Sequence, residues 1–242
     1  MIGRARGTIA RRILLNYRID PVVAAAHLPP GFTPKLANGY AIGGICLIRL
    51  EHVRPLGAPR ALGIASENAA HRYAAFRMDR GAGEDCVYIA RRHSSSRLNT
   101  TLGGRLVPTV HHPAHISVSE DDEVIDLALS AEGEWAARVR VRRAMDLPRS
   151  SAFGSLEGAS EYFRSAAVGY SPRRDGTRLD ALRLETARWE VRPLLVEIAE
   201  SRYFGDRTLF PEGSIELDCA LLMKNVDHEW RFGERASTAA AA

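Results

Sequence analysis

Residues 116–143 read ISVSEDDEVIDLALSAEGEWAARVRVRR, in which three apolar segments are separated by short polar stretches. This pattern predicts three consecutive strands, over residues 116–119, 124–130 and 135–143, joined by tight turns. In the last segment valine and arginine alternate from residue 138 to residue 142, which is typical of a strand with one buried face. Such short connections indicate antiparallel pairing. We expect the arginine face to contact solvent rather than to bind an anion.

Similar strand patterns lie on both sides of this stretch, and few helices interrupt them. Asp175-Gly176 predicts a hairpin turn, and Asp20-Pro21 predicts the start of a short helix. Two further helices are predicted from Ser94 to about Leu106 and over residues 155–166. Strands are predicted over residues 13–19, 40–53, 62–76, 86–91, 167–173, 179–185, 189–198 and 215–226.

These elements predict an α+β fold class: a mainly antiparallel, strongly curved or barrel-like sheet with a few flanking helices. We expect a single domain over residues 1–232, because no linker or repeat divides the chain. Residues 233–242 end in four alanines and are expected to form a disordered tail.

Charge and composition exclude several classes of protein. The net charge of +4 is modest and both signs are interspersed, so no nucleic-acid partner is expected. Only Lys35 and Lys224 are lysines, so amine chemistry has two candidates. Three widely spaced cysteines predict reduced, buried thiols. The N-terminal apolar run is too short for a signal peptide, and no stretch reaches the length of a membrane span. We therefore expect a cytoplasmic protein with no membrane partner.

Several short segments follow one another in a characteristic order. YRIDP at residues 17–21 precedes a short helix and LPPGF at residues 28–32. Three segments come later: a glycine-containing strand, Ser66-Glu67-Asn68, and the serine-rich beginning of a helix at residues 94–97. A late strand carries Tyr170-Ser171. Over residues 10–230 this order resembles the acetoacetate decarboxylase superfamily, especially bacterial relatives classed as a domain of unknown function. The resemblance implies an antiparallel sheet closed into a cone or barrel, with a pocket inside.

The same resemblance implies a catalytic lysine, which this chain lacks. In the decarboxylase a lysine amine forms an imine with an oxo acid. By order that lysine falls at residues 99–101, which here are Asn99, Thr100 and Thr101. Neither an amide nor a hydroxyl forms an imine. Lys35 and Lys224 lie at non-matching positions, and their polar neighbours predict solvated amines. We therefore expect no decarboxylation through an imine.

Two charged residues are candidates for the site by position. Glu67 falls where the family has a pocket glutamate, and a carboxyl inside a barrel is a plausible general acid or base; the alternative is a surface glutamate at a strand bend. Arg97 precedes the vacated lysine position and could bind a substrate carboxylate; the alternative is a solvated helix residue.

Histidines are the remaining candidates. His111, His112 and His115 are close in sequence, but no nearby cysteine or carboxylate completes a zinc ligand set, so no metal is predicted. A single histidine lining the pocket, His93 or His115, is the preferred interpretation. Motifs for serine hydrolases, phosphate loops and dinucleotide-binding folds are absent from the sequence.

Two functions remain open. The first is an enzyme without a cofactor that performs proton-transfer or lyase-type chemistry on a small carbonyl or carboxylate compound, with Glu67 moving protons. The second is a non-catalytic protein that binds such a molecule. A pocket with convergent polar groups favours the first, and a mainly apolar lining favours the second. The expected partner is a small-molecule ligand or substrate, and the sequence leaves a homo-oligomer open.

Overall fold

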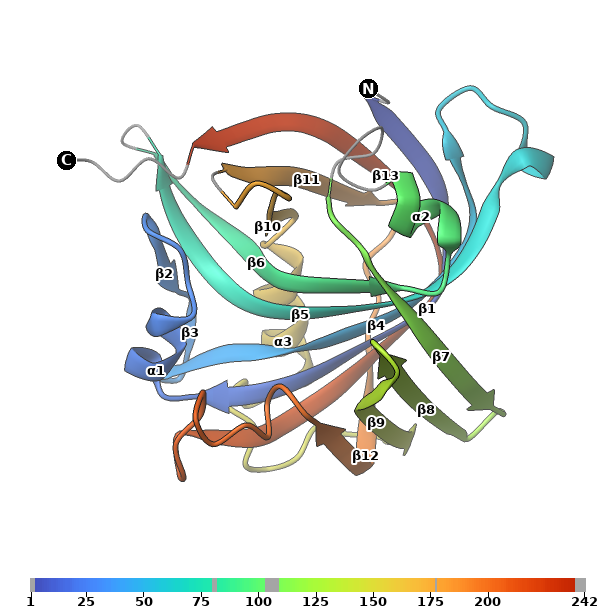
Figure 1. Cartoon of the computed structure of the whole chain (residues 1–242). Coiled ribbons are helices and arrows are strands. Elements are labelled where there is room, and N and C mark those ends of the chain that lie inside the picture. The colour runs from blue at the N-terminus through green and yellow to red at the C-terminus, as the bar shows by residue number, and fades with distance from the viewer. Residues whose placement is uncertain (1–2, 80–81, 103–108, 177, 238–242) are drawn as a thin grey trace.

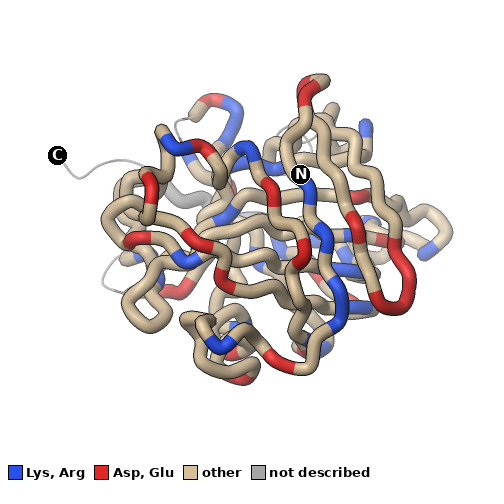
Figure 2. The backbone as a smooth tube through the Cα atoms, turned by 90° about the horizontal axis from the view of Figure 1, so that it is seen from below, with Lys and Arg blue, Asp and Glu red and all other residues tan. Residues whose placement is uncertain are grey.

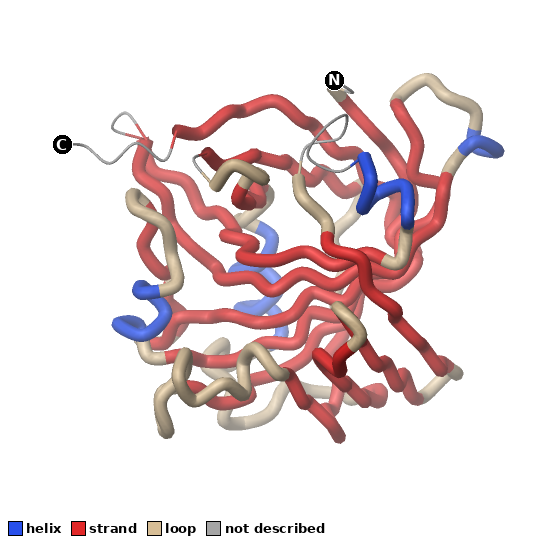
Figure 3. The backbone as a smooth tube through the Cα atoms, in the orientation of Figure 1, coloured by secondary structure: helices blue, strands red, loops and turns tan. Residues whose placement is uncertain are grey.

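The computed structural model describes residues 3–79, 82–102, 109–176 and 178–237. Strands dominate this part of the chain, and one sheet contains all thirteen of them (Figures 1 and 3). The helices are α1 (Pro21–Ala26), α2 (Arg97–Leu102) and α3 (Leu156–Arg164). The strands are β1 (Arg4–Ile19), β2 (Phe32–Pro34), β3 (Leu36–Ala37), β4 (Tyr40–Pro55), β5 (Ile64–Asp79), β6 (Ala82–Ser94), β7 (His112–Glu120), β8 (Val124–Ala131), β9 (Glu134–Arg143), β10 (Val168–Pro172), β11 (Arg178–Thr186), β12 (Arg192–Ser201) and β13 (Ile215–Ser237).

The central part of the sheet has the antiparallel order β13-β1-β4-β5-β6, and both of its edges fork. At one edge β13 pairs first with β12 and then, further along, with β11. At the other edge β6 pairs in parallel with β10 and, further along, with β7. One ring of strands therefore closes through β7, β8, β9 and β12, and a second through β10 and β11. The remaining pairings are antiparallel, which confirms the predicted α+β class with a mainly antiparallel, barrel-like sheet.

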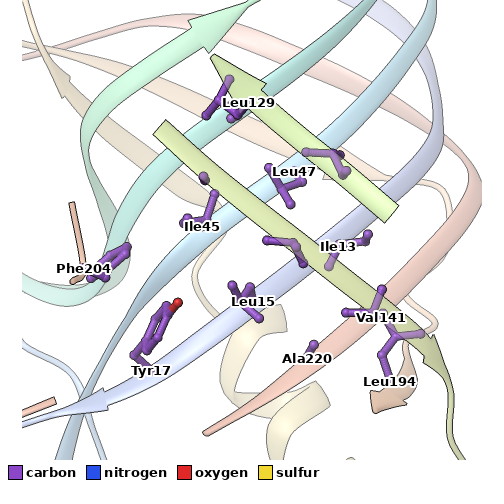
Figure 4. Close-up of a cluster of buried hydrophobic side chains, with 14 of the residues drawn as sticks. Ile13, Leu15, Tyr17, Ile45, Leu47, Leu129, Val141, Leu194, Phe204 and Ala220 are labelled. Carbon is purple, nitrogen blue, oxygen red and sulfur yellow. The ribbon is translucent and has the colours of Figure 1, made fainter. Parts of the chain in front are cut away.

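Both faces of the central strands are buried. On β1, Ile13, Leu15 and Tyr17 point into the core beneath β8 and β9, and Leu14 belongs to the core on the opposite face. Figure 4 shows side chains of β1 and β4 meeting Leu129 and Val141 from the overlying strands. Helix α3 packs with Phe163 against the opposite face. Apolar residues at successive positions of β1 and β4 are needed because each strand contributes to two cores.

Local signals placed the connections correctly. The Asp20 carboxylate accepts hydrogen bonds from the backbone N–H groups of Val22 and Val23, at 2.8 and 3.2 Å, and so caps α1. Ser155 caps α3 in the same way through the N–H of Gly158. The Asp175-Gly176 turn joins β10 to β11 as predicted, with Gly176 at φ +67°.

One prediction about chain organisation was wrong. The expected disordered tail begins at residue 233, but β13 continues to Ser237. The reason is a pairing partner: β11 offers its free edge, with Arg178 opposite Ser237 and Asp180 opposite Arg235. Residues 238–242 lie outside the described residues, as do residues 103–106 of the helix predicted to follow Ser94.

Charge is spread over the surface of the fold. In the view of Figure 2 acidic and basic residues are interspersed along most of the visible strands. Within the described part of the chain, no helix has the length and hydropathy that crossing a bilayer requires.

Gly44 of β4 marks a close approach between β1 and β4. A Cβ atom at this position would lie 2.0 Å from the carbonyl oxygen of Leu15, a backbone atom that cannot move without distorting the ladder. We expect Gly44→Ala to lower the free energy of unfolding by ~3 kcal/mol, measured by urea denaturation. Gly3→Ala is the control, because no atom lies within 4 Å of a Cβ built there. Equal stability of the two variants would contradict the observed register of β1 and β4.

Candidate functional site

A charged pocket of about 390 Å³ lies at one end of the ring closed by β7. Strands β1, β4, β5, β7 and β13 supply its walls, so it gathers side chains that are far apart in sequence. We call it the Glu67 pocket; its charged lining residues are Arg11, Arg49, Glu51, Glu67, Glu120 and Lys224.

One arginine in this pocket holds two carboxylates. Arg11 Nη2 lies 2.7 Å from Glu67 Oε2, and Arg11 Nη1 lies 2.7 Å from Glu120 Oε2. The side chains of Arg11 and Glu67 are 5% and 12% exposed, so this contact is largely shielded from water. A register shift in β1 between Ile9 and Arg11 turns Arg11 toward the pocket.

Two further cations flank this pair of carboxylates. Arg49 Nη1 lies 3.6 Å from Glu67 Oε1, and Lys224 Nζ lies 2.6 Å from Glu120 Oε1. Among the described contacts, Glu67 Oε1 has no hydrogen bond, and the long contact to Arg49 is its only ion pair. This oxygen is therefore the atom through which Glu67 can exchange a proton.

The two carboxyl groups differ in acidity although they share Arg11. Burial raises the pKa of Glu67, and repulsion by Glu120 adds to this effect, against the opposing influence of Arg11 and Arg49. Burial also acts to raise the pKa of Glu120, but hydrogen bonds from Lys224 and Arg11 outweigh it, so that pKa is lowered. A pair of carboxyl groups whose pKa values are pushed apart is characteristic of acid–base sites.

The other candidates predicted from sequence lie in different surroundings. His93 is buried on the same face of the sheet as Glu67, with ring centroids 5.7 Å from His71 and 6.0 Å from His112. Burial, together with the nearby charge of Arg91, lowers the pKa of His93 to about 4, so it is neutral at pH 7. Arg97 is exposed at the start of α2, and His115 is exposed on β7. Neither Arg97 nor His115 belongs to the described lining of either pocket.

Sequence reasoning missed several residues of the Glu67 pocket. Glu120 was interpreted as part of a turn, whereas β7 extends to it and carries it into the pocket. Arg11 was not predicted as a site residue, because its contacts with Glu67 and Glu120 join strands that are far apart in the sequence. The two lysines, expected to be solvated, both form ion pairs, and the Lys224 side chain is 38% exposed. Lys224 lines the pocket, and Lys35 is bound to Asp85 at 2.7 Å.

The segment that carries the lysine in the decarboxylase lies beside the Glu67 strand. The side-chain amide of Asn99 donates to Ser94 Oγ at 3.3 Å, and that hydroxyl donates to Asn68 Oδ1 at 2.7 Å. The backbone N–H of Glu67 donates to Ser95 Oγ at 3.0 Å.

Across residues 3–79, 82–102, 109–176 and 178–237 no group of three or more potential ligands has the spacing of a metal site.

Comparisons with known proteins identify relatives at the level of family and fold. The family model DUF2071, described as an uncharacterized conserved protein, matches residues 7–221. Acetoacetate decarboxylase from Legionella pneumophila superposes with a TM-score of 0.63 at 14% identity, covering 97% of this chain and 88% of that chain. An acetoacetate decarboxylase-like enzyme from Sphingomonas wittichii gives 0.60 at 14% identity, covering 97% and 92%. The enduracididine biosynthesis enzyme MppR, complexed with pyruvate, gives 0.58 at 12% identity, covering 98% and 90%.

These comparisons confirm the expected resemblance to the acetoacetate decarboxylase superfamily. At such low identities the likeness shows the fold alone. No curated protein matches the chain.

The two carboxyl groups on Arg11 offer a direct test of the site. We expect ¹³C NMR titration to give Glu67 a higher pKa than Glu120, with signals assigned through Glu67→Gln and Glu120→Gln. Because the charge of Glu120 raises the pKa of Glu67, Glu120→Gln should lower the pKa of Glu67. Glu161→Gln, on the exposed surface of α3, is the control and should leave it unchanged. The assignment fails if Glu67 titrates below Glu120.

Proposed function

The chain belongs to the DUF2071 family of uncharacterized conserved proteins, and we propose that it is an enzyme that transfers protons on a small carbonyl or carboxylate compound in the Glu67 pocket. The observation that carries the proposal is the pair of carboxyl groups on Arg11, whose pKa values shift in opposite directions. Glu67 is the general acid–base, and Glu120 remains ionised.

The proposed step is an enolisation. Glu67 Oε1 takes a proton from the carbon next to the substrate carbonyl, the C–H electron pair forms the enolate double bond, and the carbonyl electrons move to oxygen. Arg49 and Lys224, each with a side chain 38% exposed, stabilise the enolate oxygen or bind the substrate carboxylate. Return of the proton from Glu67 to carbon or oxygen completes the step. Arg97, His93 and His115 lie outside the pocket lining and have no part in it.

Contacts of both lysines support a mechanism without an imine. Imine formation needs an uncharged amine within bonding distance of the carbonyl. Lys224 forms an ion pair with Glu120, at 2.6 Å. Lys35 forms an ion pair with Asp85 and donates to the backbone carbonyl of Tyr162, at 2.7 and 3.0 Å. Each amine nitrogen is therefore held in a contact with a carboxylate rather than free to approach a carbonyl carbon.

The alternative function, a binding protein without catalysis, has less support. It required a mainly apolar lining, whereas six of the residues around the Glu67 pocket are charged. A buried ion pair contributes little stability because desolvation offsets the attraction, so a folding role alone is a poor reason for this network. The pocket volume of about 390 Å³ suits a small metabolite.

Proton exchange provides the test of the proposed activity. We expect the protein to catalyse exchange of α-protons with D₂O in a small oxo acid, with pyruvate, 2-oxobutyrate and levulinate as probes followed by ¹H NMR. Removing the general base should lower the exchange rate by about 10²- to 10⁴-fold in Glu67→Gln. Glu161→Gln should retain the full rate. Exchange at the same rate in Glu67→Gln, or none by the wild type with any probe, would refute the proposal.

Chemical trapping separates this mechanism from imine chemistry. We expect borohydride added with pyruvate or acetoacetate to leave the intact mass unchanged, because both amines are ion-paired. Peptide mapping after the reaction checks Lys35 and Lys224 individually. A stoichiometric adduct on Lys224 that disappears in Lys224→Ala together with activity would establish an imine mechanism instead.

A further inference from the structure

A second pocket lies where the sheet forks at β6. Its volume is about 490 Å³, and β6, β7 and β10 supply most of its walls. Strand β10 pairs with residues 86–88 of β6, and β7 pairs with His93 and Ser94. In the described part of the chain neither strand pairs with residues 89–92, so this edge of β6 faces the cavity. We call this cavity the fork pocket.

The lining of the fork pocket is strongly basic. Among the described lining residues there is no aspartate or glutamate, while the charged or titratable ones are Arg91, Arg92, His111, His112, Arg173 and Arg174. Two of the arginines have acidic neighbours just outside the cavity. Arg91 pairs with Glu132, and Arg173 has a long 3.8 Å contact with Asp180. Four arginines at one cavity without a carboxylate in its lining create a positive potential there.

Among the described contacts Arg92 forms no ion pair with a carboxylate, although the charge of Asp180 acts on it. Its Nε donates to Ser171 Oγ at 3.1 Å, which orients the guanidinium. Its Nη2 is buried and has no hydrogen-bond partner in the described structure. Burial lowers the pKa of Arg92 to about 10, which leaves it charged at neutral pH. A buried guanidinium N–H without an acceptor is costly, and an oxyanion would supply that acceptor.

Two further arginines, Arg72 on β5 and Arg12 on β1, belong to the central strands. Arg72 lies on the same face of the sheet and donates to Asn16 Oδ1 at 2.5 Å, and its guanidinium stacks 5.1 Å from the Phe163 ring. Arg12 Nε lies 3.4 Å from Cys46 Sγ. Within the described residues neither arginine forms an ion pair with a carboxylate.

His111 adds a neutral hydrogen-bonding group to the same cavity. Burial, reinforced by the charge of Arg92, lowers the pKa of His111 to about 3, so the imidazole is uncharged at neutral pH. Its Nδ1 is buried without a partner. A neutral imidazole carries one N–H and one acceptor nitrogen, and either can meet a polar group of a ligand.

We propose that the fork pocket is a binding site for a small molecule that carries an oxyanion group, a carboxylate or a phosphate, with Arg92 as its buried contact. Arg173 approaches the same group from β10, and the planar guanidinium fork suits the two oxygens of either anion. The volume of about 490 Å³ lies in the range of small-molecule sites. The fork pocket and the Glu67 pocket share no described lining residue, so this site is independent of the proposed proton transfer.

Isothermal titration calorimetry at constant ionic strength tests this site, with inorganic phosphate and succinate as separate probes. We expect at least one probe to bind, and Arg92→Ala to weaken that binding by about 10- to 100-fold through loss of a charge-assisted contact. Arg92→Lys should restore only part of it, because an ammonium lacks the planar fork. Arg192→Ala is the matched control, since its 73% exposed side chain removes the same charge far from the cavity.

The outcomes of these titrations distinguish phosphate binding from carboxylate binding. They also distinguish the proposed anion site from the proposed proton transfer in the Glu67 pocket. Binding of phosphate alone or of succinate alone identifies the group that the site accepts. If Arg92→Ala does not fold, as judged by circular dichroism, Arg173→Ala replaces it, with the same expected direction. Millimolar probes that fail to bind, or equal weakening in Arg192→Ala, would overturn the site. Glu67→Gln should leave probe binding unchanged, so the failure of either proposal does not decide the other.

Discussion

Burial of both faces of the central sheet is the constraint on which the rest of the structure depends. Strands β1 and β4 carry apolar residues at successive positions, so each face needs its own cover. Strands β7, β8, β9 and β12 cover one face, and α3 covers the other together with the segments around Phe153 and Trp189. Because β7 and β10 both pair with β6, and β11 and β12 both pair with β13, the sheet forks at both edges. Each pocket lies beside a fork: residues 89–92 of β6 line one, and Lys224 and Asn225 of β13 line the other.

The two pockets differ in how the charges of their lining residues are balanced. In the Glu67 pocket the contacts alternate in sign from Arg49 through Glu67, Arg11 and Glu120 to Lys224. Each buried charge there has a protein partner, so the site needs no ligand to be electrostatically satisfied, and its acid–base groups are already positioned. The fork pocket has four arginines and no carboxylate among its described lining residues, so its lining favours an anion from solution. The first arrangement suits proton transfer and the second suits anion binding.

Much of the fold could be predicted from sequence, because alternation and turn residues are local signals. The strand over residues 124–130, the cap at Asp20 and the helix that begins after Ser155 were predicted closely. The forks could not be predicted, since parallel pairing of β6 with two strands depends on contacts remote in sequence.

The candidate site was likewise predictable only in part. The position of Glu67 along the chain was enough to predict it as a site residue. Its contact with Arg11 depends on a register shift in β1. Glu120 contacts Arg11 from β7, 53 residues after Glu67 in the sequence. Arg97 and His115 were chosen by proximity in sequence and are exposed.

The segment where the resemblance to the decarboxylase implied a lysine adjoins the basic fork pocket. Thr100, in the segment where the decarboxylase carries its amine, lines the fork pocket beside Arg92. An amine can form a covalent imine, whereas a guanidinium remains protonated and binds oxyanions through hydrogen bonds. A cavity with arginines and no amine therefore favours reversible binding of an anionic group over covalent capture of a carbonyl. Acid–base chemistry is then left to the Glu67 pocket, where a carboxyl with a raised pKa lies among fixed cations. The fold shared with the decarboxylase does not itself decide between anion binding and acid–base chemistry in either pocket. The side chains at the two forks of the sheet distinguish the two roles.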